Sequence, residues 1–483
     1  MKRRARSASP GPGIATRRYY HVPIAMRIIG GLALLAGIGT VLLLLPGVST
    51  THPLTLQQAM FTSVSAVSVT GLSVITPSQD LTWFGQVVLL ALIQMGGVGF
   101  MVVTILILRA LRRPISLVDR LALRESLGLP ERQSFAPIVR RVMLSVFIVE
   151  GLGACLLWLT WRGQLGDGRA VWYGLFHAVS AFCNAGFDLF SGLARYPYGL
   201  PRDWHTLTIM GTIIVLGGLG FPVLADVVTW RARRRLSLHS RLTLGMAAVL
   251  IVVGALAIFI AESGGHGTFS QLDVAHRWLY ATFQSVSMRT AGFSALGDLS
   301  TLTPASQILT VGLMAVGTGP ASMGGGITTG TVVVLALLTW SYARGGHAVQ
   351  VSGRTLPVET TRRAAAVLAV SVSVIIIATW LVLITNPATL DQALFEVVSA
   401  FATTGLSLDF TGQLNSIGLV IIMVMMFWGR LGTLALILAL ARPAPVTQSG
   451  RASKSGHHLA ISSRRLTDMT RLREEWLSAI VSS

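Results

Sequence analysis

Four short stretches of this chain place a glycine beside small or polar residues at similar intervals. The glycines lie 115, 106 and 113 residues apart. The stretches read Val69-Thr70-Gly71-Leu72-Ser73, Cys183-Asn184-Ala185-Gly186-Phe187, Arg289-Thr290-Ala291-Gly292-Phe293 and Thr403-Thr404-Gly405-Leu406-Ser407. Backbone carbonyls can replace the water around a cation without a strong, trapping charge. Glycine permits the backbone dihedrals that turn carbonyls toward one axis. The motifs therefore predict a site that coordinates a bare monovalent cation.

The candidate ion-binding residues are those expected to present backbone carbonyls. They are Thr70, Gly71, Asn184, Ala185, Gly186, Thr290, Ala291, Gly292, Thr404 and Gly405. Each glycine taken alone has an alternative interpretation, because glycines also allow helices to pack closely in membranes. Four glycines in the same sequence context favour an ion filter.

A short apolar segment precedes each motif and must position it. Residues 54–69 and 388–403 are too short to cross a bilayer, and Pro53 and Pro387 suit a first helical turn. A half-helix followed by non-helical backbone at membrane depth is tolerated only where it is buried in protein or lines water. The C-terminal end of each half-helix would direct its partial negative charge at the ion. Four such hairpins around one axis have the geometry of a selectivity filter.

The composition is that of a membrane protein. Of 483 residues, 52% are hydrophobic and 12% are charged, against about 25% charged in ordinary globular chains. Eight apolar runs are expected to span the bilayer: Ile24–Leu45, Val87–Leu108, Val142–Leu159, Leu207–Val228, Leu242–Ile260, Ile308–Leu338, Ala364–Ile384 and Ile417–Leu440. The first run is long enough to be a retained helix rather than a cleaved signal peptide.

The basic residues that give the net charge of +19 lie mostly between these runs and at the two ends of the chain. Thirty-one of the 38 Lys and Arg residues fall within 2–27, 109–141, 231–241, 344–363 and 442–473. Because cytoplasmic loops are enriched in Lys and Arg, both termini are expected in the cytoplasm. Membrane lipid, rather than nucleic acid, is therefore the expected partner of the basic surface.

The repeat of about 110 residues divides the chain into six parts. A cytoplasmic basic tail (1–21) and a cytoplasmic C-terminal tail (442–483) flank four repeats of spanning helix, pore helix and spanning helix (M1–P–M2) at 22–112, 134–231, 238–342 and 361–441. The expected fold class is an all-α polytopic membrane protein with eight full spans and four half-helices in a pseudo-four-fold arrangement around one ion pore.

These residues resemble the Trk/Ktr/HKT superfamily of potassium transporters, in particular the bacterial Ktr-type membrane subunit. The four motifs carry the resemblance, with two further stretches: Ile93-Gln94-Met95-Gly96-Gly97-Val98-Gly99-Phe100 and Gly429-Arg430-Leu431-Gly432. It covers roughly residues 22–441, and an organisation without an extra pair of N-terminal helices, similar to the Ktr type, is expected.

The resemblance implies a multi-pass protein of the bacterial inner (plasma) membrane. It also implies a homodimer and a cytoplasmic RCK-type nucleotide-binding regulatory ring. The transported ion would be K⁺, held by filter carbonyls, with no tightly bound cofactor. In this family Ser at the first filter position accompanies sodium preference, so Gly71 favours potassium. Sodium or unselective monovalent cation transport by the same fold stays the alternative.

The apolar run from about Thr303 to Tyr342 is too long for one crossing and is interrupted by glycines. The segment 317–331 contains six glycines and one proline, and such a composition cannot form a stable helix interior. It is expected to be a gating loop, as in the family, and a static kink or re-entrant turn is the alternative. The candidate gating residues are Gly317, Gly319, Ser322, Gly324, Gly325, Gly326, Thr328, Thr329 and Arg430. The family often has Lys where Thr328 stands.

Five charged residues near these elements have further expected roles. Arg430 lies within the last apolar run, where a charge is costly, and is expected to raise a barrier to cations; the alternative is a structural pairing with an acid or carbonyl. By family likeness, Arg289 would pin the backbone beside the filter. Asp188 and Asp409 would draw cations to the outer mouth or be solvated loop carboxylates. Glu150 is expected to be paired or to face protein.

An intramembrane enzyme is not expected. The sequence contains no HExxH or GxSxG motif and no paired intramembrane acids. Its two cysteines, Cys155 and Cys183, are too few for a disulfide framework or a zinc site.

Overall fold

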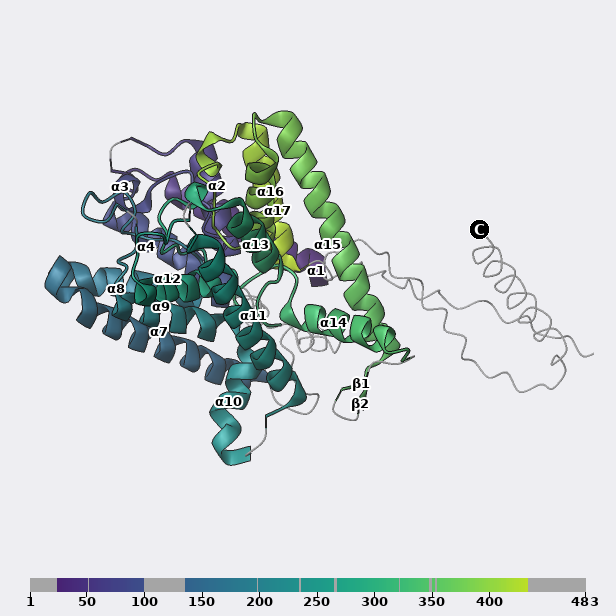
Figure 1. The fold of residues 1–483 in the computed structure, drawn as a ribbon. Coiled ribbons are helices and arrows are strands. Elements are labelled where there is room, and N and C mark those ends of the chain that lie inside the picture. Colours follow the sequence, from purple (N-terminus) through teal and green to yellow (C-terminus); the bar gives the residue numbers. More distant parts are fainter. Residues whose placement is uncertain are drawn as a thin grey trace, which may run out of the picture. The chain divides into compact units, whose positions relative to one another are not determined.

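The computed structural model describes residues 24–50, 52–99, 135–197, 199–233, 236–264, 267–320, 322–346, 350–351 and 354–432. The predicted tails 1–21 and 442–483, and most of the basic segment 109–141, lie outside these residues. Nearly all the regular secondary structure of the described part is helical (Figure 1), and its strands β1 (Gln350–Val351) and β2 (Arg354–Thr355) form one short antiparallel pair. The mostly helical fold class is therefore confirmed.

The same order of elements occurs four times along the chain: a longer helix, a shorter helix, a loop, and a helix that is often divided. The first set is α1 (Ile24–Leu43), α2 (Leu56–Ser68), α3 (Pro77–Asp80), α4 (Trp83–Gln94) and the π-helix η1 (Met95–Gly99). The second is α7 (Phe135–Leu165), α8 (Asp167–Phe182), α9 (Trp204–Gly218) and α10 (Phe221–Arg233). The third is α11 (Leu238–Glu262), α12 (Val274–Ser287), η2 (Leu299–Thr301), α13 (Pro304–Ala315) and α14 (Thr329–Ala343). The fourth is α15 (Val358–Thr385), α16 (Leu390–Ala402), η3 (Thr411–Gln413) and α17 (Ser416–Leu431).

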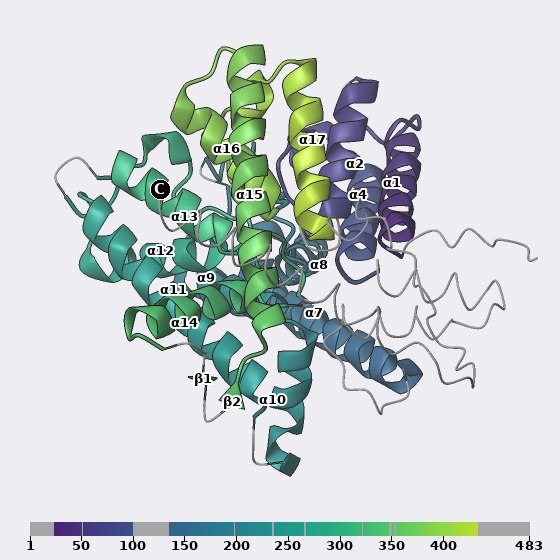
Figure 2. The same ribbon diagram turned by 90° about the vertical axis from the view of Figure 1, so that its right-hand side faces the viewer.

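Three described helices are long and apolar enough to cross a membrane: Met143–Leu165, Leu238–Glu262 and Val358–Thr385. Shorter apolar helices cover much of the remaining predicted runs. The short helices α2, α8, α12 and α16 bury most of their residues, whereas no more than 28% of each long helix's most apolar 18-residue window is buried. The long α15 lies on the outside beside α16, and α17 lies near α2 (Figure 2). The short helices thus form the interior that positions the motifs.

Two expectations about helix boundaries are wrong. Pro53 and Pro387 do not lie in a first helical turn, because Thr55 and Thr389 are the N-caps of α2 and α16. Each threonine forms a capping box with the glutamine three residues later, which satisfies N–H groups at the helix start. The prolines therefore lie two residues before the caps.

The predicted run Leu207–Val228 is also divided, although a break was expected only in the third set. Helix α9 ends at Gly218, and α10 begins at Phe221. Gly220 between them has φ 88°, a left-handed conformation that does not continue a helix. The carbonyl of Gly218, freed by the break, accepts a hydrogen bond of 2.9 Å from the amide of Gly319. The break therefore allows a contact with the segment 317–331 after α13.

Candidate ion-conduction site

The four glycine motifs lie next to one another, although more than 100 residues separate them in sequence. A Cβ added at Gly71 would lie 2.5 Å from the carbonyl oxygen of Ala185 and 3.0 Å from the Cα of Gly186. A Cβ added at Gly186 would lie 3.1 Å from both the carbonyl oxygen of Ala291 and the Cα of Gly292. The first motif therefore contacts the second, and the second contacts the third.

The remaining contacts close the ring. A Cβ added at Gly292 would overlap the carbonyl oxygen of Thr404 and lie 3.4 Å from the Cα of Gly405. One added at Gly405 would overlap the carbonyl oxygen of Thr70 and lie 3.0 Å from the Cα of Gly71. The carbonyl that precedes each glycine thus lies against the neighbouring motif, so four such carbonyls are distributed around the ring. All ten predicted ion-binding residues belong to this ring or adjoin it in sequence.

Each motif has the same unusual backbone. A residue with positive φ lies two positions before each glycine: Val69 (53°), Asn184 (55°), Thr290 (67°) and Thr403 (51°). The glycines follow with φ of 91°, 70°, 78° and 90°. Left-handed conformations are costly for β-branched residues such as Val69 and Thr403, and such strain collects at functional sites.

A serine behind each motif holds this backbone, and sequence analysis did not assign it a role. The hydroxyls of Ser65 and Ser399 accept the amides of Gly71 and Gly405, each at 3.1 Å. Ser180 donates to the carbonyl of Phe187 at 2.8 Å, and Ser287 donates to the carbonyl of Phe293. The signal was present in the sequence, because each serine lies four residues after a phenylalanine (Phe61, Phe176, Phe283 and Phe395).

The segment between α13 and α14 folds back on itself. Val316 and Ile327 form a parallel bridge, and the amide of Gly317 donates to the carbonyl of Ile327 at 2.9 Å. Thr328 is the N-cap of α14, and the amide of Thr329 donates to the carbonyl of Thr318 at 3.0 Å. These two predicted gating residues therefore close the segment at the start of α14.

The same segment contacts the residues at the base of the motifs. The amide of Gly325 donates to the hydroxyl of Thr403 at 2.9 Å. A Cβ added at Gly324 would overlap the hydroxyl of Thr290, and Gly326 lies beside Ala402. The predicted gating residues Gly324, Gly325 and Gly326 therefore pack under the third and fourth motifs, where a side chain would not fit.

Other predicted gating residues anchor this segment elsewhere. The Gly319 amide bonds to the carbonyl of Gly218, and the hydroxyls of Ser322 and Thr318 lie 2.6 Å apart. A Cβ added at Gly317 would overlap the carbonyl of Gly325, so Gly317 permits the close return of the chain.

Arg430 connects this segment to the first set of helices. Its guanidinium donates to the carbonyl of Met323 and to the carbonyls of Gly96 (2.6 Å) and Gly97 (3.0 Å) in η1. Arginine suits this task because its planar fork presents several donors at once. Pairing with carbonyls was one of the two interpretations of Arg430, and the donors sit directly against the interrupted segment.

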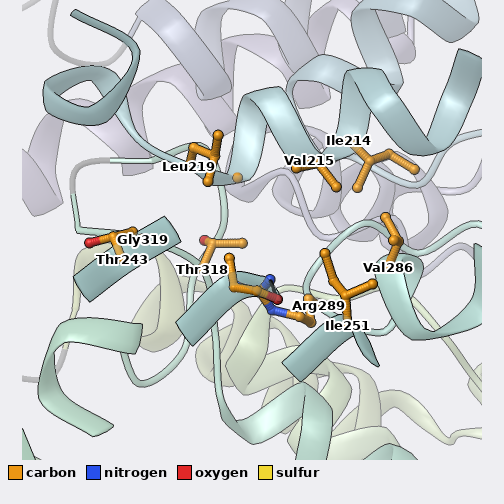
Figure 3. Close-up of a pocket in the computed structure, with 11 residues that line it drawn as sticks. Ile214, Val215, Leu219, Thr243, Ile251, Val286, Arg289, Thr318 and Gly319 are labelled. Carbon is orange, nitrogen blue, oxygen red and sulfur yellow. Dashed lines mark hydrogen bonds between the residues drawn. The ribbon is translucent and has the colours of Figure 1, made fainter. Parts of the chain in front are cut away.

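Arg289 donates to a backbone carbonyl, as the family likeness leads us to expect, although this carbonyl belongs to α11 and not to its own motif. Its guanidinium donates to the carbonyl of Ala247 on α11 at 3.5 Å, a long hydrogen bond. The side chain lines a small pocket with Thr318, Gly319 and apolar residues of α9 and α11 (Figure 3). Arg289 therefore lies behind the third motif, facing the interrupted segment.

The remaining charged candidates have different environments. Glu150 on α7 is 3% exposed, and the side-chain amide of Gln94 donates to it at 3.0 Å, as expected of a paired group. Asp409 is exposed, with φ 60°. Asp188 is not a solvated carboxylate, because His177, Ser191 and the amide of Phe190 all contact it within 3.0 Å.

Residues 32–449 match the TrkH family model, described as a cation transport protein. The chain belongs to the TrkH family of cation transport proteins. The resemblance inferred from the motifs is therefore confirmed, as is the expectation that the chain is a transport protein rather than an enzyme.

Several proteins similar to this TrkH-family chain are named for the ions they take up. The Ktr system potassium uptake protein B of Vibrio alginolyticus is 35% identical over 84% of this chain and 88% of its own length. The protein of the same name from Bacillus subtilis is 35% identical over 84% and 90%. The potassium/sodium uptake protein NtpJ of Enterococcus hirae is 31% identical over 79% and 84%. The crystal structure of the potassium transporter TrkH from Vibrio parahaemolyticus matches with a TM-score of 0.69 over 88% of this chain and 86% of that one; at 16% identity this shows the shared fold.

Asp188→Asn is expected to destabilise this TrkH-family protein by about 1–3 kcal/mol at pH 7. Burial raises the pKa of Asp188, but hydrogen bonds and the charge of His177, with bonds from Ser191 and Phe190, outweigh burial and lower it. A carboxyl whose folded pKa is depressed stabilises above its unfolded pKa of about 3.9, and loses this contribution as the pH falls through the folded pKa. Thermal unfolding in detergent should show the difference at pH 7 and a smaller one near pH 3. Asp409→Asn, at an exposed residue, is the control and should have no effect; an equal loss at both pH values would contradict the assignment.

Proposed function

We propose that this protein is a potassium uptake subunit that passes K⁺ through a carbonyl-lined filter down its electrochemical gradient. The closed ring of four motifs carries the proposal, because one backbone carbonyl of each motif lies in the ring and none of the ten candidate ion-binding residues is acidic. Behind two of the motifs, serine hydroxyls accept the backbone amides of the glycines. These amides therefore do not pair with the ring carbonyls, which stay available to an ion. A membrane potential supplies about 2.3 kcal/mol per charge per 100 mV, enough to concentrate a cation inside.

The architecture we infer is four M1–P–M2 repeats around one pore, at 22–112, 134–231, 238–342 and 361–441. The fourfold order of helices and the buried position of α2, α8, α12 and α16 support it. Each short helix ends at or just before its motif, so its partial negative charge would point at the ion. Eight full spans are reached only if each divided pair, α9 with α10 and α13 with α14, counts as one crossing of the bilayer.

We infer that the segment 317–331 and Arg430 form the gate. The segment lies against Thr290 and Thr403 at the base of two motifs, where it would obstruct an ion that leaves the ring. In the described part of the chain, hydrogen bonds to Gly217, Gly218, Ala315, Thr403 and Arg430 tether the segment, and these can be broken without unfolding a helix.

Thr403→Val is expected to raise the rate of K⁺ uptake about threefold or more. Valine keeps the shape and the β-branch of threonine but lacks the hydroxyl that accepts the Gly325 amide, and one such bond contributes about 0.5–1.5 kcal/mol. Uptake of ⁸⁶Rb⁺ by whole cells, normalised to the amount of protein in the membrane, measures the effect. Thr403→Ser retains the hydroxyl and should behave like wild type. Slower uptake by the valine variant at normal protein level would argue against a gate at this contact.

We infer the assembly from the likeness to the Trk/Ktr family. We infer a homodimer in the bacterial plasma membrane, with both termini in the cytoplasm, lipid around the long helices, and a cytoplasmic RCK-type nucleotide-binding ring as regulatory partner. The Ktr relatives are named as parts of a system, which fits a separate regulatory chain.

Sodium transport is the competing function, because the relative NtpJ is named for both ions. Gly71 at the first filter position favours potassium. Growth rescue of a bacterium that lacks its potassium uptake systems, at limiting K⁺, tests the proposal. The protein is expected to restore growth at limiting K⁺, and added Na⁺ should not substitute for K⁺. Good expression without rescue would refute potassium uptake. Equal competition of ⁸⁶Rb⁺ uptake by K⁺ and Na⁺ would favour an unselective pathway.

A further inference from the structure

Glu396 is a buried acid behind the fourth motif with no role in the ion path described above. It lies on α16 and is fully buried. Its Oε2 accepts the hydroxyl of Ser407 at 2.7 Å, and its Oε1 accepts the hydroxyl of Thr411. Among the residues that the structure describes, no cationic side chain is paired with it. A carboxyl buried at this depth is costly, so its two hydroxyl partners are what keep it there.

The contact extends to the outer end of the motif. The hydroxyl of Ser407, two residues after Gly405, also accepts the amides of Phe410 (3.1 Å) and Thr411 (3.4 Å). Glu396 therefore orients the hydroxyl around which the chain turns as it leaves the ring. On the inner side, Ser399 of the same helix holds the amide of Gly405. One helix thus fixes the fourth motif at both ends.

The second motif has a matching contact. His177 stands nine residues before Gly186, as Glu396 does before Gly405, and its Nε2 lies 3.0 Å from Asp188, two residues after that glycine. The contacts of the four glycines place the second and fourth motifs opposite each other in the ring, since each touches the first and third.

The other two motifs lack such a contact in the described structure. Thr62, nine residues before Gly71, has no hydrogen-bond partner for its hydroxyl. Gln284, behind the third motif, accepts only a long bond of 3.4 Å from the amide of Ala295, and its side-chain nitrogen has no partner. Ionisable side chains therefore brace one opposite pair of motifs only.

We propose that Glu396 is a positioning residue for ion selectivity, which fixes the outer end of the fourth motif through Ser407 and Thr411, with the His177–Asp188 pair as its counterpart across the ring. This inference rests on the proposed function. A ring of carbonyls discriminates between ions that differ in size and hydration only while its dimensions or its coordination number are maintained. Loss of one brace should let the fourth motif adapt to a smaller ion without closing the path.

The test is the K⁺/Na⁺ permeability ratio of the full-length protein, purified and reconstituted in liposomes. Glu396→Ala should lower the ratio about tenfold or more while K⁺ flux persists, because both hydroxyl contacts are lost. Glu396→Gln retains an acceptor for Ser407 and an amide that can donate to Thr411, so its ratio should stay within about threefold of wild type. Glu359→Ala removes an exposed glutamate on α15 and should leave the ratio unchanged.

A second variant, Ser407→Ala, distinguishes a positioning role of Glu396 from a general role in folding. If Glu396→Ala does not yield folded protein, Ser407→Ala removes one contact without leaving the carboxyl wholly unpaired, and it should lower the ratio by about threefold or more. An unchanged ratio in folded Glu396→Ala, or in Ser407→Ala when it replaces that variant, overturns the inference while the wild-type selectivity upholds the proposed function. A wild-type protein that conducts K⁺ and Na⁺ equally overturns the proposed function itself.

Discussion

Gly405→Ser is expected to abolish growth rescue at limiting K⁺ and to reduce K⁺ uptake at least about tenfold. A Cβ at this position would overlap the carbonyl oxygen of Thr70 and lie 3.0 Å from the Cα of Gly71, both of them backbone atoms of the neighbouring motif. The φ of 90° adds a strain of about 1–3 kcal/mol for any residue with a Cβ. Relieving either the overlap or the backbone strain would displace a carbonyl of the ring. The measurement is the K⁺ concentration that supports half-maximal growth.

Gly412→Ser provides the matched control. Gly412 follows Gly405 in the same loop, and a Cβ added there would meet no atom within 4 Å. It should rescue growth like wild type at an equal protein level. If Gly405→Ser rescued equally well, Gly405 would not belong to the filter.

Arg430→Ala is expected to increase K⁺ uptake about fivefold or more and to lower thermal stability. The change removes a cation below the ring and leaves the carbonyls of Met323, Gly96 and Gly97 without their charged donor. Hydrogen bonds to charged groups contribute about 1.5–3 kcal/mol each, so their loss should release the segment 317–331. Initial rates of ⁸⁶Rb⁺ uptake and the melting temperature in detergent measure the two effects.

Two further variants control for charge and geometry. Arg344→Ala removes an exposed arginine that packs over the ring of Trp340, and it should change neither quantity much. Arg430→Lys keeps the charge but not the planar fork, so it should fall between alanine and wild type. Slower uptake by Arg430→Ala, in protein that is normally folded, would contradict a barrier role.

The repeated motifs were predictable because sequence similarity among them is local. The phenylalanine, the serine four residues later and the glycine recur in each repeat, so the four short helices and the glycines that follow them could be predicted. The left-handed residue two positions before each glycine could not, because β-branched residues such as Val69 and Thr403 disfavour that conformation. The family resemblance followed from the same residues. The serines behind the motifs were visible but unassigned, since a serine in an apolar helix often bonds to its own backbone.

The partners of Arg430 were beyond sequence reasoning. Its contacts with Gly96 and Gly97 span 334 and 333 residues, and only the packed fold brings α17 and η1 together. The break at Gly218 was missed for a related reason, because glycine is common in unbroken membrane helices. Its cause lies in the contact with Gly319, a residue of another helix set. Pro53 and Pro387 were wrongly expected in the first helical turns, because capping by Thr55 and Thr389 determines where the helices begin.

We propose that the closed ring of four motifs selects potassium. The most direct measurement is the reversal potential of liposomes that contain the purified wild-type protein, with K⁺ on one side and Na⁺ on the other. We expect a potential close to that of a K⁺-selective membrane in the wild type, and loss of that selectivity in Gly405→Ser. A potential near zero in the wild type, with cation flux present, would contradict it.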